Sequence, residues 1–287
     1  MVLQSLPTDL RNSYLTYLGS TGEPAESIEP TVSMLIKLHR AHLDRVAYTN
    51  LEIQLDHSTS IDPLESVRRI LGGRGGYCFH LNLAFAALLL GIGYDVVVAR
   101  AAVPTAGEDG HAWGNHVIAL VRLGGESFIV DVGIRDGLRD PLLLREHTVL
   151  SAPFRYRLEH SGGVLWHLYY EERASIAGFD LDVTPVEPSS FALEHVFLST
   201  SQDSYFVRNF IAHRRPADHV LTLRGCVLTR TDVHTRSSRD ILTEREWLTL
   251  LVEEFGLSLG NLSRQERLGL WRRVQARHNA WNQVGRP

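Results

Sequence analysis

A glycine-rich segment leads directly into an apolar run, and one cysteine, Cys78, lies where the two meet. Gly72–Gly76 is followed by Tyr77, Cys78 and then the apolar stretch Leu81–Leu90. Glycines punctuate secondary structure, so we expect a helix whose first turn contains or adjoins Cys78. The free N–H groups at a helix start favour a thiolate and can hold an oxyanion. Cys78 is therefore a candidate nucleophile, although a lone cysteine beside aromatic residues is more often an inert core residue.

Two strand-like patterns separated by Gly124-Gly125 predict a β-hairpin. A two-residue turn at these glycines places His116 and Asp131 on one face of the hairpin as diagonal neighbours. A four-residue loop keeps that parity, whereas a three-residue loop breaks it. Asp131 lies in an apolar strand, where an unpaired carboxylate would be costly to bury, so we expect it to bind His116. The other ring nitrogen of His116 would then take a proton from Cys78.

Other interpretations of these residues are weaker but remain open. His116 alone is as well explained as a hydrogen-bonded core histidine, so the three residues carry the prediction only as a set. Cys78 with His80, His111 and His116 could suggest zinc, but no second cysteine lies nearby and no His-Glu-x-x-His is present. We therefore expect no metal. The glycines around Arg74 lack the Gly-Lys-Ser/Thr ending of a nucleotide-binding loop.

The periodicity of apolar residues predicts the elements that position this set. Helical spacing dominates the first ninety residues, including a helix from the N-cap Asp62 to Leu71, with Glu65 as the third-position partner of the cap. Alternating patterns predict strands at 95–103, 116–121, 128–132, 155–158 and 164–170. Further on, strands are predicted near 219–223 and 226–229, and helices at 243–254 and 263–281.

Composition excludes several classes of protein. The chain has 287 residues, 44% of them apolar, which is enough for a substantial core. A formal charge of -4 gives no reason to expect a nucleic acid or an anionic membrane as partner. The longest apolar run is too short to cross a bilayer, and no secretory signal is evident. Only two cysteines, Cys78 and Cys226, are present, so we expect free thiols and a cytoplasmic location.

The motifs taken together resemble the arylamine N-acetyltransferase family. Its hallmark is Arg-Gly-Gly-x-Cys-(Phe/Tyr) at a helix start, then an Asn-His strand, then Val-Asp-Val-Gly. Here these are 74–79, 115–116 and 130–133, in the same order and with comparable spacing. The resemblance implies an α+β fold: an N-terminal helical bundle (1–92), a central β-barrel (93–190) and a C-terminal α/β lid (191–287). It also implies a Cys-His-Asp triad like that of cysteine proteases.

The chemistry implied by this resemblance is a two-step acyl transfer. Cys78 takes an acyl group from a thioester, typically acetyl-coenzyme A, and passes it to an arylamine or hydrazine, with no permanently bound cofactor. The implied pocket residues are Tyr48, Tyr77, Phe79, His80, Gly133 and Ile134. Alternatives are an amide synthase that releases a polyketide from an acyl carrier protein, a non-catalytic binding module of the same fold, and a thiol hydrolase or transglutaminase-like enzyme.

Several positions depart from the family pattern around the pocket. Tyr48-Thr49-Asn50 stands where Phe-Glu-Asn is common, and His80 replaces the usual acidic residue. Two carboxylates near Arg74 are therefore expected to be missing. After Val-Asp-Val-Gly, where an aromatic residue and a further glycine are usual, this chain has Ile134-Arg135-Asp136-Gly137. We expect these changes to affect donor and acceptor specificity.

Overall fold

The computed structural model describes residues 2–20, 27–104 and 113–283. Its first part is helical: α1 (Thr8–Tyr17), α2 (Val32–Arg45), α3 (Leu51–Gln54), α4 (Pro63–Leu71) and α5 (Cys78–Ile92). The predicted N-cap of α4 is confirmed, because the Asp62 side chain accepts the N–H of Leu64 at 2.9 Å. Glu65 does not close a capping box, since its carboxylate binds Ser60 and Arg69 instead.

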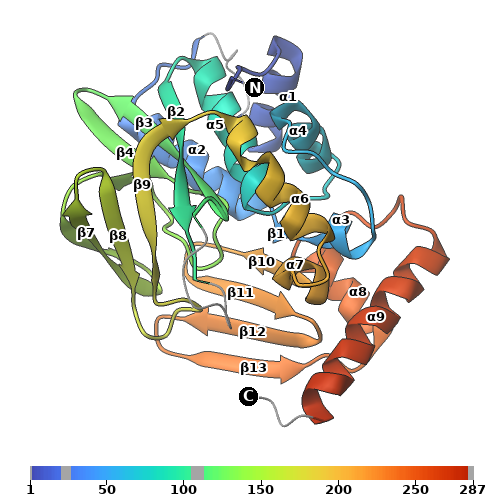
Figure 1. Ribbon diagram of the computed structural model, residues 1–287. Helices are drawn as coiled ribbons and strands as arrows, with labels where there is room; N and C mark the ends of the chain where they lie inside the picture. Colours follow the sequence, from blue (N-terminus) through green and yellow to red (C-terminus); the bar gives the residue numbers. More distant parts are fainter. Residues whose placement is uncertain (1, 21–26, 105–112, 284–287) are drawn as a thin grey trace.

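Helix α5 is enclosed on nearly every side, as its apolar sequence requires. All its residues from Cys78 to Leu89 are buried. It packs against α1 and α4 on one side and against β2 (Asp95–Ala102) and β3 (His116–Leu123) on the other. Figure 1 shows α5 running through the middle of the molecule between these layers. Cys78, the first residue of this helix, is therefore held by a rigid support.

The central part of the chain forms an eight-stranded antiparallel sheet in the order β5-β4-β3-β2-β9-β8-β7-β6. Besides β2 and β3 it contains β4 (Glu126–Val130), β5 (Leu142–Leu143), β6 (His147–Ser151), β7 (Phe154–Gly162), β8 (Leu165–Tyr170) and β9 (Gly178–Val186). The sheet curls (Figure 1), but no ladder joins its edge strands β5 and β6 among the described residues. The predicted closed barrel is thus an open half-barrel, because the two-residue strand β5 is too short to continue the ladder.

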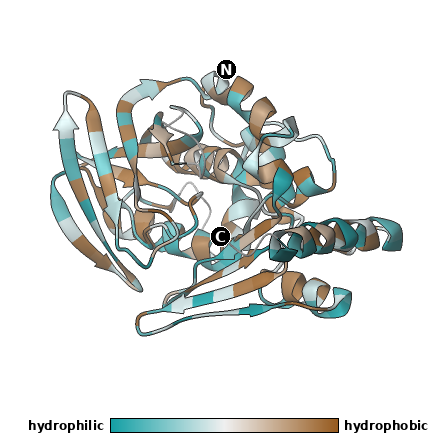
Figure 2. Cartoon of the chain, turned by 60° about the horizontal axis from the view of Figure 1, so that its bottom comes forward, coloured by the Kyte–Doolittle hydropathy of each residue, from teal (hydrophilic) through white to brown (hydrophobic). Residues whose placement is uncertain are grey.

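Buried and exposed residues alternate along the outer strands of the half-barrel, so that one face of the sheet packs into a hydrophobic core. In β7, Phe154, Tyr156 and Leu158 are buried while Arg155 and Arg157 are exposed. The strands at the left of Figure 2 change between brown and teal along their length in the same way. The apolar face joins residues of β2, β3, β8 and β9 in one buried cluster. This core supports β3 and β4, which carry the candidate site.

A second sheet of five antiparallel strands forms the last part of the fold, in the order β1-β10-β11-β12-β13. Its strands are β1 (Tyr48–Thr49), β10 (Ile211–Arg214), β11 (His219–Arg224), β12 (Val227–Asp232) and β13 (Arg236–Asp240). Helices α8 (Glu244–Glu253) and α9 (Arg264–Gln283) share a buried cluster with it. The short helices η2 (Pro188–Phe191), α6 (Ala192–Thr200) and α7 (Tyr205–Arg208) lead from the half-barrel to this sheet.

The predicted lobes interlock. Strand β1 comes from the helical part of the chain yet pairs with β10 of the second sheet. The cluster around α5 also takes in Val117 and Ile211, which lie in the second and third predicted ranges. The described residues form three hydrophobic clusters, while the boundaries 1–92, 93–190 and 191–287 stay a prediction.

The two cysteines are free and buried. Cys226 belongs to the core of the second sheet, and burial, with Asp240 adding to it, raises the pKa of its thiol to about 11. Such a thiol is poorly suited to nucleophilic chemistry. A search of the described helices finds none whose length and apolar content would allow it to cross a membrane.

Candidate active site

Cys78 is the first residue of α5, as the glycine-rich segment predicted. Tyr77 holds the N-cap position with an extended backbone, and its side chain does not cap the helix. The N–H groups of the first turn are therefore not capped by the Tyr77 side chain and can stabilise a negative charge. The Cys78 side chain is buried, with only 3% of the residue exposed, and its sulfur lies 3.8 Å from the carbonyl oxygen of Asn115.

The hairpin folds with the predicted two-residue turn. Gly124 and Gly125 have φ values of 62° and 82°, the left-handed conformation that this turn requires. Strand β4 pairs with β3 in the predicted register, and Asp131 is the next residue along the chain. Nε2–H of His116 donates to Oδ2 of Asp131 at 2.7 Å. The two side chains are thus paired as the hairpin geometry predicted, and Cys78 and Asp131 both act on the pKa of the His116 ring.

Asn82 is a site residue that the sequence analysis did not assign. One turn after Cys78, its Nδ2 donates to Oδ1 of Asp131 at 2.8 Å, while its Oδ1 accepts the N–H of Val132 at 2.8 Å. The backbone N–H of Gly133 also donates to Oδ1 of Asp131, at 2.9 Å. The helix that carries the thiol therefore also orients the carboxylate. The signal in the sequence is a lone asparagine in a run of buried apolar residues, which must find polar partners.

The electrostatics of the pair follow from these contacts. Burial opposes a charge on His116, but the Asp131 carboxylate and the hydrogen bonds to Asp131 and Cys78 outweigh it and raise the pKa of His116 to about 10. Burial likewise opposes ionisation of Asp131, yet His116, Asn82 and the Gly133 N–H lower the pKa of the carboxyl. The imidazolium form of His116 is therefore favoured beside the Asp131 carboxylate.

Gly133 and Ile134, the next residues after Val132, lie close to the three candidate catalytic residues. A Cβ on Gly133 would lie 2.8 Å from both the Cα of Cys78 and Nδ2 of Asn82, so only glycine allows this approach of the loop to α5. Ile134 lines a small internal cavity beside Asp131, of about 10 Å³. Gly133 therefore packs directly against the start of α5, and Ile134 shares a small cavity with Asp131.

The predicted pocket residues around the cysteine lie on the opposite side of the α5 start. The Tyr77 hydroxyl donates to Nδ1 of His195 at 2.5 Å, and the Phe79 ring packs 5.4 Å from that of Phe191. The His80 ring stands edge-on to Tyr77, with 4.7 Å between centroids, and neither of its nitrogens has a hydrogen-bond partner within the described part of the chain. The side chains of Tyr77, Phe79 and His80 therefore point into the protein, towards the short helices η2 and α6. His111, named with His80 as a metal alternative, lies outside the described residues.

Positions 49 and 80 carry no carboxylate, as expected, but Arg74 has another carboxylate partner. Nε of Arg74 donates to Oε1 of Glu52 at 2.6 Å. Glu52 lies three residues after Thr49, in the first turn of α3, and so supplies the charge that Thr49 does not. The Thr49 hydroxyl instead donates to the carbonyl of Ile211 at 2.9 Å, which ties β1 to β10.

Tyr48 lies close to the thiol on this side of the site. It is buried, which raises the pKa of its hydroxyl well above the usual range, and the Cys78 thiol adds to that effect. Its ring packs 5.4 Å from that of His213. The same hydroxyl also feels the charge of Arg135. Tyr48 is therefore influenced both by the candidate nucleophile and by Arg135.

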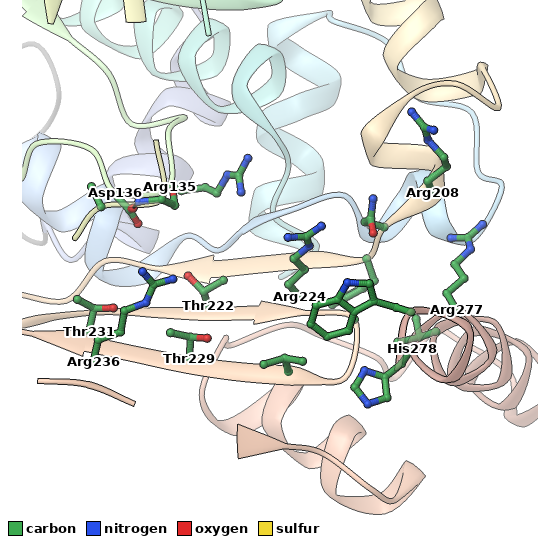
Figure 3. A pocket seen from close by; sticks show the side chains of 18 of the residues that line it. Arg135, Asp136, Arg208, Thr222, Arg224, Thr229, Thr231, Arg236, Arg277 and His278 are labelled. Atoms are coloured by element: carbon green, nitrogen blue, oxygen red, sulfur yellow. Dashed lines mark hydrogen bonds between the residues drawn. The ribbon is translucent and has the colours of Figure 1, made fainter. Parts of the chain in front are cut away.

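A cavity of about 460 Å³ lies beyond Tyr48, above the second sheet (Figure 3). We call it the arginine groove, because its lining includes Arg135, Arg173, Arg208, Arg224, Arg236 and Arg277. The floor comes from β11 and β12, and the walls come from α7, α9 and the loop after Asp131. The sequence analysis did not find it, because these arginines are dispersed along the chain and meet only in the fold.

Comparison with known proteins agrees with this architecture. A family model described as N-acetyltransferase matches residues 31–264. The chain therefore belongs to the arylamine N-acetyltransferase family, which also has amide-synthase relatives. The solved structure of the arylamine N-acetyltransferase from Mycobacterium abscessus superposes with a TM-score of 0.81, at 26% identity, over 94% of this chain and 95% of that one.

Two of the similar proteins are named for different reactions. The arylamine N-acetyltransferase / N-hydroxyarylamine O-acetyltransferase of Salmonella typhimurium is 28% identical over 240 residues, which are 81% of this chain and 85% of that protein. Proansamycin X synthase of Amycolatopsis mediterranei is 33% identical over 125 residues, which are 42% of this chain and 46% of that protein. Membership of the family supports an acyltransferase enzyme.

Proposed function

We propose that this chain transfers an acyl group from a thioester to an amine by way of an acyl-cysteine at Cys78. The observation that supports the proposal most is the 2.7 Å pair of His116 and Asp131, buried beside a cysteine at a helix start. An activated nucleophile needs a base within reach and a group that orients the base. His116 and Asp131 would fill these two roles.

The first half of the reaction loads the cysteine. His116 holds the proton of the Cys78 thiol, and the sulfur attacks the thioester carbonyl carbon. The first-turn N–H groups of α5 would stabilise the oxyanion that forms. The bond between the carbonyl carbon and the donor sulfur then breaks, and His116 returns the proton to the leaving thiolate. The acyl group remains on Cys78, and the donor, typically acetyl-coenzyme A, leaves as a free thiol.

The second half passes the acyl group on. The nitrogen of an arylamine or hydrazine attacks the acyl-cysteine carbon, and the bond from that carbon to the Cys78 sulfur breaks. His116 accepts the amine proton and restores the starting pair. No resident cofactor or metal takes part in this scheme. Asp131 stays ionised throughout, because its lowered pKa keeps it a carboxylate at neutral pH.

An amide synthase is the second candidate. The match to proansamycin X synthase has the higher identity of the two relatives, although it covers less than half of each chain. In that case the acyl group would be a carrier-bound chain, and the attacking amine would belong to the same chain and close a ring. The chemistry at Cys78 would be the same in both cases.

Intact mass spectrometry without amine distinguishes these functions. The protein is incubated with acetyl-coenzyme A and, separately, with a longer acyl thioester, and Cys78→Ala serves as the matched control. We expect an acetyl adduct of wild type that is absent from Cys78→Ala, with an unchanged melting temperature in the variant. An adduct only from the longer thioester would favour the amide synthase.

Three results would contradict the proposal. No adduct from either thioester would point to a binding module that keeps the fold. Rapid loss of the adduct to water, without transfer to an added arylamine or hydrazine, would point to a thiol hydrolase. An adduct that persists in Cys78→Ala would exclude Cys78 as the nucleophile.

A further inference from the structure

The small cavity beside Asp131 combines apolar walls with several polar groups. Its volume of about 10 Å³ is room for a single water molecule. The apolar part of the lining consists of Ile129, Ile134, Leu138, Leu168 and Phe179. The polar part consists of His39, Asp131, Asp140 and Tyr170. The cavity therefore meets both conditions for a buried water, which are enough space and more than one polar neighbour.

Tyr170 on β8 brings a hydroxyl without a partner to this cavity. The residue is 8% exposed, and its hydroxyl oxygen is buried with no hydrogen-bond partner in the described part of the chain. Burial, Tyr156 and the Asp131 charge together raise the pKa of this hydroxyl well above its usual range, so the hydroxyl feels the carboxylate. A buried O–H that stays unpaired is costly. The Tyr170 hydroxyl therefore needs an acceptor inside the cavity.

His39 on α2 faces more acceptors than a neutral ring can serve. Its Nδ1 lies 2.9 Å from the carbonyl oxygen of Arg139, and its Nε2 lies 3.2 Å from the carbonyl oxygen of Asp131. Both oxygens only accept, whereas a neutral imidazole has one N–H. Burial lowers the pKa of His39, which keeps the ring neutral near pH 7. The shorter contact takes the proton, so Nε2 is left as an acceptor that needs a donor.

The Asp131 carboxylate has room for one more donor. Its Oδ1 accepts the Asn82 amide and the Gly133 N–H, and its Oδ2 accepts His116. An ionised carboxylate offers about four acceptor positions. Asp140, the other carboxylate in the lining, is already in an ion pair and has no hydrogen to donate. The groups that face the cavity are thus one donor and two acceptors in need of partners.

We propose that one buried water occupies this cavity and connects Tyr170, His39 and Asp131. The water accepts the Tyr170 O–H, donates one hydrogen to Nε2 of His39 and donates the other to a carboxylate oxygen of Asp131. Three hydrogen bonds are the usual number for a buried water. This single molecule satisfies the hydroxyl, the ring nitrogen and the carboxylate at once. Tyr170 and His39 are thus positioning residues that act on Asp131 through the water.

The consequence for catalysis rests on the proposed acyl transfer, because the water acts on the carboxylate that orients His116. A further donor stabilises the ionised form of Asp131 and fixes the plane of its carboxylate. Without that donor, the carboxylate is a stronger acceptor for the Nε2–H of His116 and is held less firmly. The water therefore tunes the pair from the side of the half-barrel core.

The water itself is tested without any substrate. High-resolution crystal structures of wild type and Tyr170→Phe are compared, and nitrogen NMR of the histidine side chains identifies the tautomer of His39. We expect a water within hydrogen-bond distance of all three groups in wild type, its loss in Tyr170→Phe, and a proton on Nδ1 of His39. A dry cavity, a direct hydrogen bond from Tyr170 to Asp131, an unchanged water in the variant or a proton on Nε2 of His39 would each overturn the proposal.

The effect on the reaction is tested with a matched tyrosine. Tyr14 on α1 is also buried, its hydroxyl has no partner among the described residues, and it does not line the cavity. We expect Tyr170→Phe to slow acylation of Cys78 by about three- to tenfold, the loss of one water-mediated hydrogen bond to a charged group. The proton resonance of His116 Nε2–H should move downfield in the same variant, because its acceptor is stronger. Tyr14→Phe should leave the rate and the resonance unchanged.

Wild-type rate and resonance in Tyr170→Phe would overturn the positioning role. The same change in Tyr14→Phe would also overturn it, because any lost buried hydroxyl would then suffice. The crystal structures and the resonance need no turnover, so the two failures are distinguishable. Wild type that no thioester acylates, but that holds the water and shows the shift in Tyr170→Phe, would contradict the proposed function and support the water site.

Discussion

Two histidines flank the start of α5 at the same depth, and only one has a charged partner. His116 is 3% exposed and His80 is 2% exposed. His116 binds Asp131, whereas both nitrogens of His80 lack a partner in the described structure. Burial, with Arg69 and His195 adding to it, lowers the pKa of His80 well below its usual range, while Asp131 helps to raise the pKa of His116 to about 10. Burial alone therefore keeps a histidine neutral, and the partner decides whether it can carry a proton.

The two sides of the α5 start also differ in the groups that they hold in place. On the sheet side, Asn82 and the backbone fix a carboxylate. On the other side, the Tyr77 hydroxyl donates to Nδ1 of His195, and Nε2–H of His195 donates to the carbonyl of Thr59 at 2.8 Å. These two hydrogen bonds require a neutral His195, because its Nδ1 accepts while its Nε2–H donates. Burial lowers the pKa of His195, which agrees with the neutral form. One region holds charge for chemistry, and the other fixes the loop before Cys78 without charge.

The largest expected effect comes from removing the charge on the sheet side. Asp131→Asn keeps the shape but leaves His116 without its carboxylate, so we expect acylation of Cys78 to slow by about 10²- to 10⁴-fold. The loss of a buried charge partner should also lower the free energy of unfolding by about 3 kcal/mol. Stopped-assay mass spectrometry and urea unfolding measure the two effects. The control is Asp95→Asn on β2, whose side chain is 62% exposed. Equal melting temperatures for wild type and Asp131→Asn would show that the carboxylate is not a buried partner.

A smaller effect follows from the pH dependence of the pair. The pKa of His116 is raised in the folded state, so its stabilisation is complete below the unfolded value near 6.5 and is lost as the pH rises towards about 10. The difference in unfolding free energy between wild type and Asp131→Asn should therefore shrink from pH 6 to pH 9.5, by at least about 1 kcal/mol. Groups common to both proteins cancel in this difference. A difference that stays constant or grows over this range would contradict a protonated His116.

What could be predicted from the sequence was local. The turn at Gly124-Gly125 fixed the register that brings His116 to Asp131, and the glycines before Cys78 marked the start of α5. The open half-barrel was not foreseen, because closure depends on whether two edge strands far apart in space can meet. Strand β9 was missed although it pairs with both β2 and β8. The strands with which β9 pairs depend on the strand order of the sheet, which the residues of β9 alone do not reveal.

The polar contacts that were missed are long-range. Asn82 lies 49 residues from Asp131, so its role depends on how α5 crosses the sheet. Glu52, at the start of α3, replaces the carboxylate missing at Thr49, because the fold brings it to Arg74, 22 residues away. The arginine groove combines residues from 135 to 277. Each of these follows from tertiary packing, which motif spacing does not encode.

The smallest expected effect tests the uncharged side of the comparison. His80 stands at a position named for the pocket, yet its ring is enclosed by Tyr77 and His195. In His80→Leu we expect acylation of Cys78 to stay within about twofold and the unfolding free energy to change by less than about 1 kcal/mol, because unpaired polar atoms are replaced by apolar ones. The matched change His195→Leu breaks two hydrogen bonds and should cost more stability. A loss of acylation in His80→Leu as large as that in Asp131→Asn would mean that the unpaired ring acts on the substrate, and the two sides of α5 would then not differ in the way their partners indicate.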